Sequence, residues 1–237
     1  MKLLLLLLLP QVAIDTTRAV PLPPVVITAT RSMRAVSDVP VPVQLVPAEA
    51  IRRSGAARLS DVLAEQPGLL LFEDHGTGLM IQGFEPDYTL LLLDGEPVIG
   101  RTAGTLDLKR FTVQGLDRIE IVRGPTSSLY GSEALAGVVN LIRHRPEAPM
   151  ATTLHARMER FGTYQLGATS ELRRNRLGAT LLLDHYRTEG YDLAPEVFGP
   201  TAPALRDYTA DTYLTWDLPR SALLSVAARY HQQQQQS

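Results

Sequence analysis

The stretch RIEIVRGPTSSLYGSEALAGVVNLI, residues 118–142, decides the fold of this chain. Its first residues alternate in the manner of a strand, and Gly124-Pro125 breaks that alternation. Small polar residues follow, and an apolar run closes the stretch. Charges lie close around the central loop, at Arg118, Glu120, Arg123 and Glu133. No catalytic pattern requires these charges, so their role depends on where in the cell the chain folds.

The composition excludes several classes of protein. The 237 residues are 45% hydrophobic and carry a net charge of −2, which predicts a folded protein without affinity for nucleic acid. The absence of cysteine excludes disulfides, thiol catalysis and cysteine-bound zinc. The phosphate-loop and nucleophile-elbow motifs are missing, and the histidines are not at metal-ligand spacing. We therefore expect no enzyme activity, no catalytic residue, no metal site and no cofactor.

The amino terminus is typical of an exported protein. Lys2 precedes seven leucines at residues 3–9, and Pro10 ends the apolar run. The run is much shorter than the roughly 20 residues that a membrane-spanning helix needs. This is the layout of a secretory signal peptide, and the small residue Ala19 favours cleavage after it. We therefore assign residues 1–19 as a signal peptide.

Residues 20–46 form a predicted extended arm. Its prolines fix their own backbone angles and favour extended geometry in the residues before them. Within the arm, VVITATR at residues 25–31 is rich in β-branched residues and suited to join an exposed sheet edge. Any edge strand would have the same pattern, so this stretch alone does not identify a partner.

Two short helices and a mixed sheet are predicted next. PAEAIRRSG (residues 47–55) and RLSDVLAEQPG (residues 58–68) carry helix start and stop signals. Strands follow as far as residue 142, and we expect LMIQG and YTLLLLDG to pair as an antiparallel hairpin. That pairing would bring the loops at residues 74–78 and 94–105 to one end of the sheet. Both loops are rich in glycine, and they are either a ligand-contact surface or simple turns.

After Pro146 the chain consists of segments of roughly ten residues with imperfect polar and apolar alternation. Short turns lie at one end of these segments, and a long loop at residues 189–207 lies at the other. The pattern predicts barrel strands over residues 150–231, and a soluble antiparallel sandwich is the alternative. Residues 232–237 are predicted to be a low-complexity tail. Aromatic residues near the segment ends suit the interfacial girdles of a barrel: Phe161, Tyr164, Tyr186, Tyr191, Tyr208, Trp216 and Tyr230.

These stretches, in this order, resemble the TonB-dependent outer-membrane transporters. VVITATR resembles the energy-coupling box, called the TonB box, while LSDVLAEQPGLLL, IQGFEPDYTLLLLDGEPV and LDRIEIVRGPTSSLYGSEALAGVVNLI resemble the plug domain. The resemblance covers nearly the whole chain after the leader and is greatest to vitamin B12 and catecholate-siderophore receptors. It implies an α+β plug domain, with a mixed sheet and short helices, over residues 47–146. Antiparallel strands of an incomplete transmembrane β-barrel would follow.

The resemblance also implies roles for individual residues. A TonB-type energy-transducing protein would capture the coupling box by strand addition at Val25, Val26, Ile27, Thr28, Ala29 and Thr30. Plug–barrel contacts, or contacts with one another, would be made by Arg118, Glu120, Arg123 and Glu133. A metal-chelate or cobalamin ligand would meet His75, Thr77, Arg101 and Thr102. One departure is Gln82, which stands where the family usually has arginine, so that one charge pair is missing.

The predicted function is that of the N-terminal part of a receptor in the bacterial outer membrane, in contact with its lipid. Such a receptor would take up an iron–siderophore complex or cobalamin. Plugged transporters have about 22 strands, whereas only about five strands of roughly ten residues fit here. Five strands leave an open edge, which lipid does not tolerate. We therefore expect a piece of a longer receptor or a non-functional truncated receptor; a soluble periplasmic plug-like interaction module is the alternative.

Overall fold

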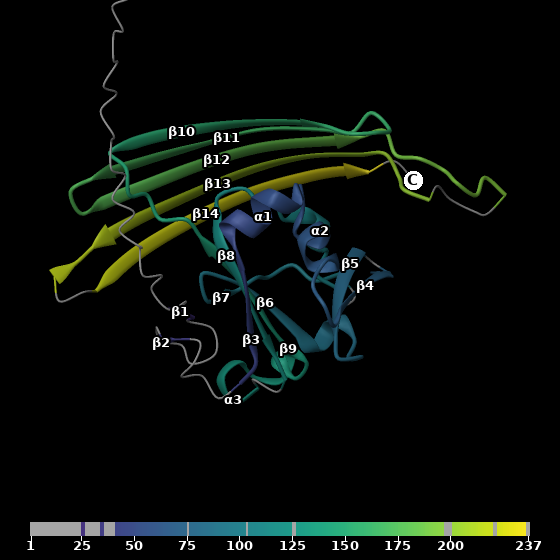
Figure 1. The fold of residues 1–237 in the computed structure, drawn as a ribbon, viewed down its shortest axis with the longest axis horizontal. Helices are drawn as coiled ribbons and strands as arrows, with labels where there is room; N and C mark the ends of the chain where they lie inside the picture. The colour runs from purple at the N-terminus through teal and green to yellow at the C-terminus, as the bar shows by residue number, and fades with distance from the viewer. Residues whose placement is uncertain are drawn as a thin grey trace, which may run out of the picture.

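A long curved sheet lies across a smaller unit of short strands and helices (Figure 1). The computed structural model describes residues 25–26, 34–35, 41–74, 76–102, 104–124, 127–196, 201–219 and 222–235. The predicted signal peptide, His75 and four of the six coupling-box residues lie outside these ranges. We refer to residues 41–146 as the plug region. Within the described ranges, no helix has the length and apolar character needed to cross a membrane.

The plug region is built on a five-stranded mixed sheet. β6 and β9 are parallel neighbours, and the other neighbouring strands are antiparallel. This mixed sheet agrees with the predicted α+β class. In spatial order the strands are β3 (Val43–Pro47), β8 (Leu116–Arg123), β9 (Gly137–Arg143), β6 (Thr89–Leu93) and β7 (Glu96–Pro97).

Residues 118–142 form the centre of this sheet. β8 and β9 are antiparallel neighbours, connected through α3 (Ser127–Tyr130) and a 3₁₀ turn at Ser132–Ala134. Apolar side chains of both strands fill the main core. Gly137 begins β9 because the two backbones approach closely there: a Cβ atom would lie 2.4 Å from the carbonyl oxygen of Val122.

Two short helices pack beside these strands. α1 (Ala48–Ser54) contacts β3 and β8, and it ends at Gly55, whose φ of +67° favours glycine. α2 (Leu59–Ala64) begins after Arg58, whose backbone N–H donates to the Asp61 carboxylate at 2.9 Å. Because Asp61 makes this cap, the Arg58 side chain is available for contacts outside the helix.

The predicted pairing of LMIQG with YTLLLLDG is wrong. β5 (Gly76–Ile81) pairs with β4 (Leu69–Asp74) instead, and β6 pairs with β9. A 3₁₀ turn at Pro86–Tyr88 separates β5 from β6, and β6 is an uninterrupted apolar run. Such runs are typical of parallel strands covered on both faces. The two glycine-rich loops still come together, because Gly78 lies against Thr105.

The curved sheet is an antiparallel meander in chain order, and we refer to it as the wall. A tight turn joins β11 to β12, and the loop between β12 and β13 lies at the opposite end, as predicted (Figure 1). Among the strands that the structure describes, β10 and β14 have a neighbour on one side only, so the wall is not a closed barrel. Its strands are β10 (Met150–Met158), β11 (Tyr164–Arg174), β12 (Leu177–Thr188), β13 (Leu205–Asp217) and β14 (Leu223–Gln235).

Part of the predicted low-complexity tail at residues 232–237 is a strand. β14 continues to Gln235, and Gln232 to Gln235 pair with residues 205–208 of β13. A strand ladder uses backbone N–H and C=O groups, which glutamine supplies as well as other residues do. A run of glutamines is therefore compatible with a strand.

The two faces of the wall differ in chemistry, because successive side chains of a strand alternate between its faces. The face turned away from the plug region exposes large apolar side chains: Met150, Leu154, Leu166, Leu181, Leu183, Leu214 and Val226. The face turned toward the plug region is mostly polar and buries Gln165, Thr169, Asp184, Asp207, Thr209 and Thr215. An apolar exterior and a polar interior are typical of an outer-membrane barrel.

Candidate functional site

The plug region meets the wall through deeply buried charged side chains. Arg58, just before α2, is 3% exposed. One of its guanidinium nitrogens donates to both carboxylate oxygens of Asp207 at 2.7 Å, and the other donates to Asp184 at 3.4 Å. The guanidinium also lies 4.3 Å from the ring centre of Tyr186. Such partners are needed because a buried charge has lost its hydration.

Asp184 is held in turn by the two preceding strands. Its Oδ1 accepts a hydrogen bond from Gln165 at 2.6 Å and lies 3.1 Å from Nε2 of His155. His155, Gln165, Asp184 and Asp207 come from β10, β11, β12 and β13. We refer to these four residues and Arg58 as the Arg58 cluster. It connects one residue of the plug region to four consecutive strands of the wall.

A second charged contact lies at the end of β9. The Arg143 guanidinium bonds to Asp94 at 2.6 Å and to Asp211 of β13 at 3.0 Å. It also lies 4.1 Å from the ring centre of Tyr213. Asp94 accepts a further hydrogen bond from the Arg143 backbone at 2.9 Å. Asp94, in the turn after β6, therefore holds the Arg143 side chain in the orientation in which it contacts the wall.

In a third contact, the charged side chain belongs to the wall. Arg229 of β14 donates to the backbone carbonyl of Arg110 at 2.7 Å, and its guanidinium lies 4.4 Å from the ring centre of Phe111. Beside β11, His144 lies 3.6 Å from Glu171. The plug region is thus held at points on β11, β12, β13 and β14, and polar or charged groups make these contacts.

The predicted plug–barrel residues contact the plug region itself. Arg118 bonds to Glu120 at 2.9 Å and to Asp117 at 2.7 Å. Glu120 is fully buried, so this pair stabilises the inside of the plug region. Pairing of these charges with each other was one of the two arrangements that the family resemblance implied.

Arg123 and Glu133 lie away from the wall. Arg123 donates to Gln44 and to the carbonyl of Pro67, and Glu133 lies 4.0 Å from Arg101. α3, between them in sequence, is at the end of the plug region furthest from the wall (Figure 1). The contacts of Arg123 and Glu133 are therefore within the plug region and not with the five described wall strands. A barrel contact for these two residues stays a prediction.

Two residues of the predicted coupling box are described. Val25–Val26 form β1, which pairs antiparallel with β2 (Arg34–Ala35). The start of the box is thus extended and already part of a strand ladder, the geometry that strand addition uses. Residues 27–30 lie outside the described ranges.

The predicted substrate residues differ in accessibility, and His75 lies outside the described ranges. Thr77 is fully buried, and its hydroxyl donates to Glu73 at 2.8 Å. Thr102 is exposed. A solute contact at Thr102 stays a prediction, and Arg101 orders the same loop by donating to the backbone carbonyls of Pro86, Thr89 and Gly104 at 3.2, 2.9 and 3.0 Å.

Glu73 makes this region sensitive to pH. Burial raises the pKa of its carboxyl, but hydrogen bonds from Lys109, at 2.8 Å, and from Thr77 outweigh burial and hold the pKa below its usual value. Because the pKa of Glu73 is lower in the folded protein than in the unfolded protein, its carboxylate stabilises the fold at pH values above the unfolded-state pKa. This contribution is lost as the pH falls through the folded-state pKa. The pair is largely exposed, so the contribution is small.

Replacing Lys109 with glutamine should raise the pKa of Glu73, because the stronger of its two partners loses its charge. An NMR titration of the Glu73 carboxyl carbon measures this pKa directly. An unchanged or lower value would contradict the assignment of Lys109 as the group that holds the pKa down.

Sequence reasoning did not single out the residues that join the plug region to the wall. A signal existed for Asp184, Asp207 and Asp211, because each occupies an inward position of a predicted barrel strand, where a carboxylate needs a partner. No comparable signal marks Arg58, since an arginine before a short helix is ordinarily exposed. Its partners lie 126 and 149 residues further along the chain. Within the described ranges, no cluster of three or more His, Cys, Asp or Glu side chains has metal-binding geometry.

Comparison with known proteins identifies the plug region. Residues 35–138 match the family model of the TonB-dependent Receptor Plug Domain. This segment contains α1, α2 and all of β8. This match confirms the resemblance of the plug region to the plug domain of the TonB-dependent receptors, as the sequence implied.

Solved siderophore receptors share the fold of the plug and the wall. A variant of the ferric enterobactin receptor from Pseudomonas aeruginosa, in complex with enterobactin, has a TM-score of 0.67 at 21% identity, over 81% of this chain and 33% of its own. The ferripyoverdine receptor of the outer membrane of Pseudomonas aeruginosa has a TM-score of 0.72 at 18% identity, over 88% and 27%. The siderophore receptor PirA from Acinetobacter baumannii has a TM-score of 0.67 at 20% identity, over 81% and 32%.

The chain thus spans about a third or less of the length of each of these receptors. At these identities the similarity establishes the fold: a plug beside antiparallel strands of a partial barrel. The predicted outer-membrane location agrees with that of the family.

Proposed function

We propose that this chain is the N-terminal part of a TonB-dependent receptor that actively takes up a large, scarce solute. The observation that carries the proposal is the wall, which is apolar on its exposed face and ionically bound to the plug on the other. An iron–siderophore complex is the favoured solute, because the similar structures are described as receptors for ferric enterobactin and ferripyoverdine. Cobalamin is the second candidate, on the sequence resemblance alone.

The exposed apolar face favours a membrane receptor over a soluble periplasmic module. Leu154 of β10 is 77% exposed, Leu166 of β11 51% and Leu183 of β12 47%, on three strands that are consecutive neighbours in the wall. Soluble monomers rarely expose a contiguous apolar surface of this kind. Lipid, in contrast, is the solvent in which such a surface is stable.

The proposed mechanism assigns different tasks to the parts of the plug. Solute contact at the loop of Arg101 and Thr102 biases the arm at residues 20–31 toward release. A TonB-type protein of the inner membrane then adds the coupling box to its own sheet and pulls. The Arg58 cluster holds the plug against the wall until that pull. Charged contacts suit this task because water that enters an opening gap can hydrate the separated groups.

Fractionation and uptake test the proposal together. Cells that make the receptor carrying this chain should contain it in the outer-membrane fraction. They should accumulate radioactive iron from a ferric siderophore only while the inner membrane is energised. Recovery of the protein in the soluble periplasmic fraction would contradict the proposal.

Alanine at Arg101 should weaken solute binding about tenfold or more, because the loop loses the three hydrogen bonds from a charged donor that hold its backbone in place. Alanine at Thr102 should weaken binding by a smaller factor through loss of one direct contact. Equilibrium binding of the ferric siderophore to the purified receptor measures both. Arg53→Ala, at an exposed position of α1, is the control. Unchanged affinity in both variants would remove these residues from the binding site.

A further inference from the structure

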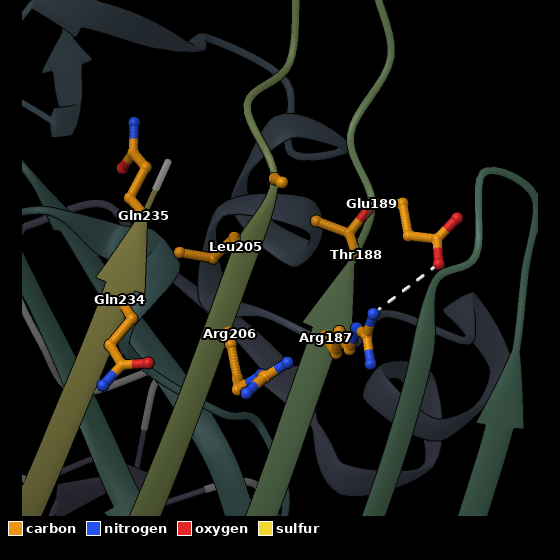
Figure 2. A pocket seen from close by; sticks show the side chains of 8 residues that line it. Arg187, Thr188, Glu189, Leu205, Arg206, Gln234 and Gln235 are labelled. Atoms are coloured by element: carbon orange, nitrogen blue, oxygen red, sulfur yellow. Dashed lines mark ion pairs between the residues drawn. The ribbon is translucent and has the colours of Figure 1, made fainter. Parts of the chain in front are cut away.

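A pocket at one end of the wall is lined by two like charges. It has a volume of about 280 Å³ and lies at the ends of β12, β13 and β14 (Figure 2). Arg187 of β12 and Arg206 of β13 are direct cross-strand partners in this pocket. Their chain neighbours Tyr186 and Asp207 contact the plug, so both arginines face away from it.

Within the described ranges, a single carboxylate lies at ion-pair distance from this pair of arginines. Glu189 lies 3.6 Å from Arg187, on the side away from Arg206 (Figure 2). Arg206 has no acidic group at ion-pair distance within the ranges that the structure describes. Like charges directly opposite each other destabilise a sheet. An anion bound between the two guanidinium groups would remove this repulsion.

The position of the pair along the wall indicates the source of the anion. Long loops of outer-membrane barrels are extracellular, and both arginines flank the long loop between β12 and β13. Next to them on the outer face are Tyr164, His185 and Tyr208, with His185 4.4 Å from Tyr208 and 5.5 Å from Tyr164 between ring centres. Aromatic rings of this kind gather at the membrane interface. The pair therefore lies at the height of the outer-leaflet headgroups.

We propose that Arg187 and Arg206 bind the phosphate group of a phosphorylated lipid in the outer leaflet. The inference rests on the proposed function, because it requires a wall that spans that membrane. A guanidinium donates two parallel hydrogen bonds to a phosphate, and two such groups face the pocket from adjacent strands. Gln234, at an outward position of β14, lines the same pocket and adds a neutral hydrogen-bonding group. The exposed leucines further along the outer face lie beside the acyl chains.

Lipid binding to the purified receptor carrying this chain tests the inference. In detergent, a short-chain phosphatidic acid should bind more tightly than a phosphatidylcholine of the same chain length, as measured by native mass spectrometry. The double variant Arg187→Gln/Arg206→Gln should lose affinity for phosphatidic acid about tenfold or more. Arg174→Gln, which removes an exposed arginine at the other end of the same face, should leave it unchanged. Glu189→Gln should increase it, because the remaining carboxylate repels the phosphate.

Two results would overturn the inference. One is equal affinity of the double variant and the native protein for phosphatidic acid, with both found in the outer membrane. The other is displacement of the lipid by equimolar inorganic phosphate, which would assign the pocket to a soluble anion. Either result leaves the proposed function standing, whereas recovery of the receptor in the soluble fraction would overturn the proposed function itself. The variants alter exposed side chains, so heat-modifiable migration on gels should show that they fold.

Discussion

Replacing Arg58 with alanine should destabilise the contact between plug and wall more than any other single change in that contact. Asp184 and Asp207 would remain buried, with side chains 0% exposed, and would lose the cation that both contact. Breaking a buried ion pair from one side costs about 3–5 kcal/mol. The expected consequence is a plug that leaves the wall without a pull from the inner membrane.

Hydrogen exchange of α2 amides in the purified receptor measures this effect. The expected loss corresponds to exchange that is roughly 100-fold to several thousand-fold faster. Arg53→Ala is the matched control, because Arg53 pairs with Glu49 on the surface at side-chain exposures of 73% and 70%. Such exposed pairs contribute about 0–1 kcal/mol. If the two alanine variants exchange at the same rate, Arg58 does not hold the plug.

A neutral version of the cluster separates charge from packing. In Arg58→Met with Asp184→Asn and Asp207→Asn, no uncompensated charge remains buried. Replacing a whole buried ion group in this way is often neutral or stabilising. Exchange in α2 should therefore return toward the native rate. If it stays as fast as in Arg58→Ala, the loss comes from packing and the electrostatic account is wrong.

Proline at Ile27 should abolish uptake and leave solute binding intact. Strand addition joins the coupling box to its partner through backbone hydrogen bonds, and proline has no N–H to donate. Val25–Val26 are already in a strand immediately before this position. The predicted solute loops belong to a different segment of the chain, so affinity for the ferric siderophore should not change. Energy-dependent accumulation of radioactive iron and equilibrium binding measure the two properties separately.

The control for this experiment is Ile27→Ala. Alanine keeps the backbone N–H, and strand addition depends little on the side chain, so uptake should remain near the native level. Uptake that persists in the proline variant would count against the coupling box at residues 25–30. Loss of uptake in both variants would show that the side chain of Ile27, rather than its backbone, is recognised.

The sequence predicted the wall well because its signal is local. A strand with one face in lipid alternates apolar and polar residues, and Leu214, Thr215 and Trp216 show that alternation within one segment. The sequence signals for the helices are equally local, since Pro47 and Gly55 mark the ends of α1. Residues 118–142 were assigned correctly to the mixed sheet of the plug, and the structure adds that they form its centre.

The sequence failed where the result depended on contacts between distant segments. The strand at residues 89–93 was paired with its neighbour in sequence, whereas its partner β9 begins at residue 137. The charges around Gly124 drew attention because they are close in sequence, and they stabilise the plug internally. Arg58 was not singled out, because its importance comes from its pairing with Asp184 and Asp207, which lie far from it in the sequence. Buried ion pairs between distant segments leave no periodic pattern in the sequence from which they could be predicted.

The central claim is that the wall has one face in lipid and the other against the plug. The chain contains no cysteine, so single cysteines along residues 181–183 of β12 and 212–215 of β13 can be labelled selectively in this part of the receptor. A fluorescent label at each position, quenched in turn by spin-labelled lipid and by a water-soluble quencher, measures its surroundings. We expect quenching by lipid at Leu181, Leu183 and Leu214, and protection from both quenchers at Leu182, Tyr213 and Thr215. Equal quenching by lipid at neighbouring positions would contradict the claim.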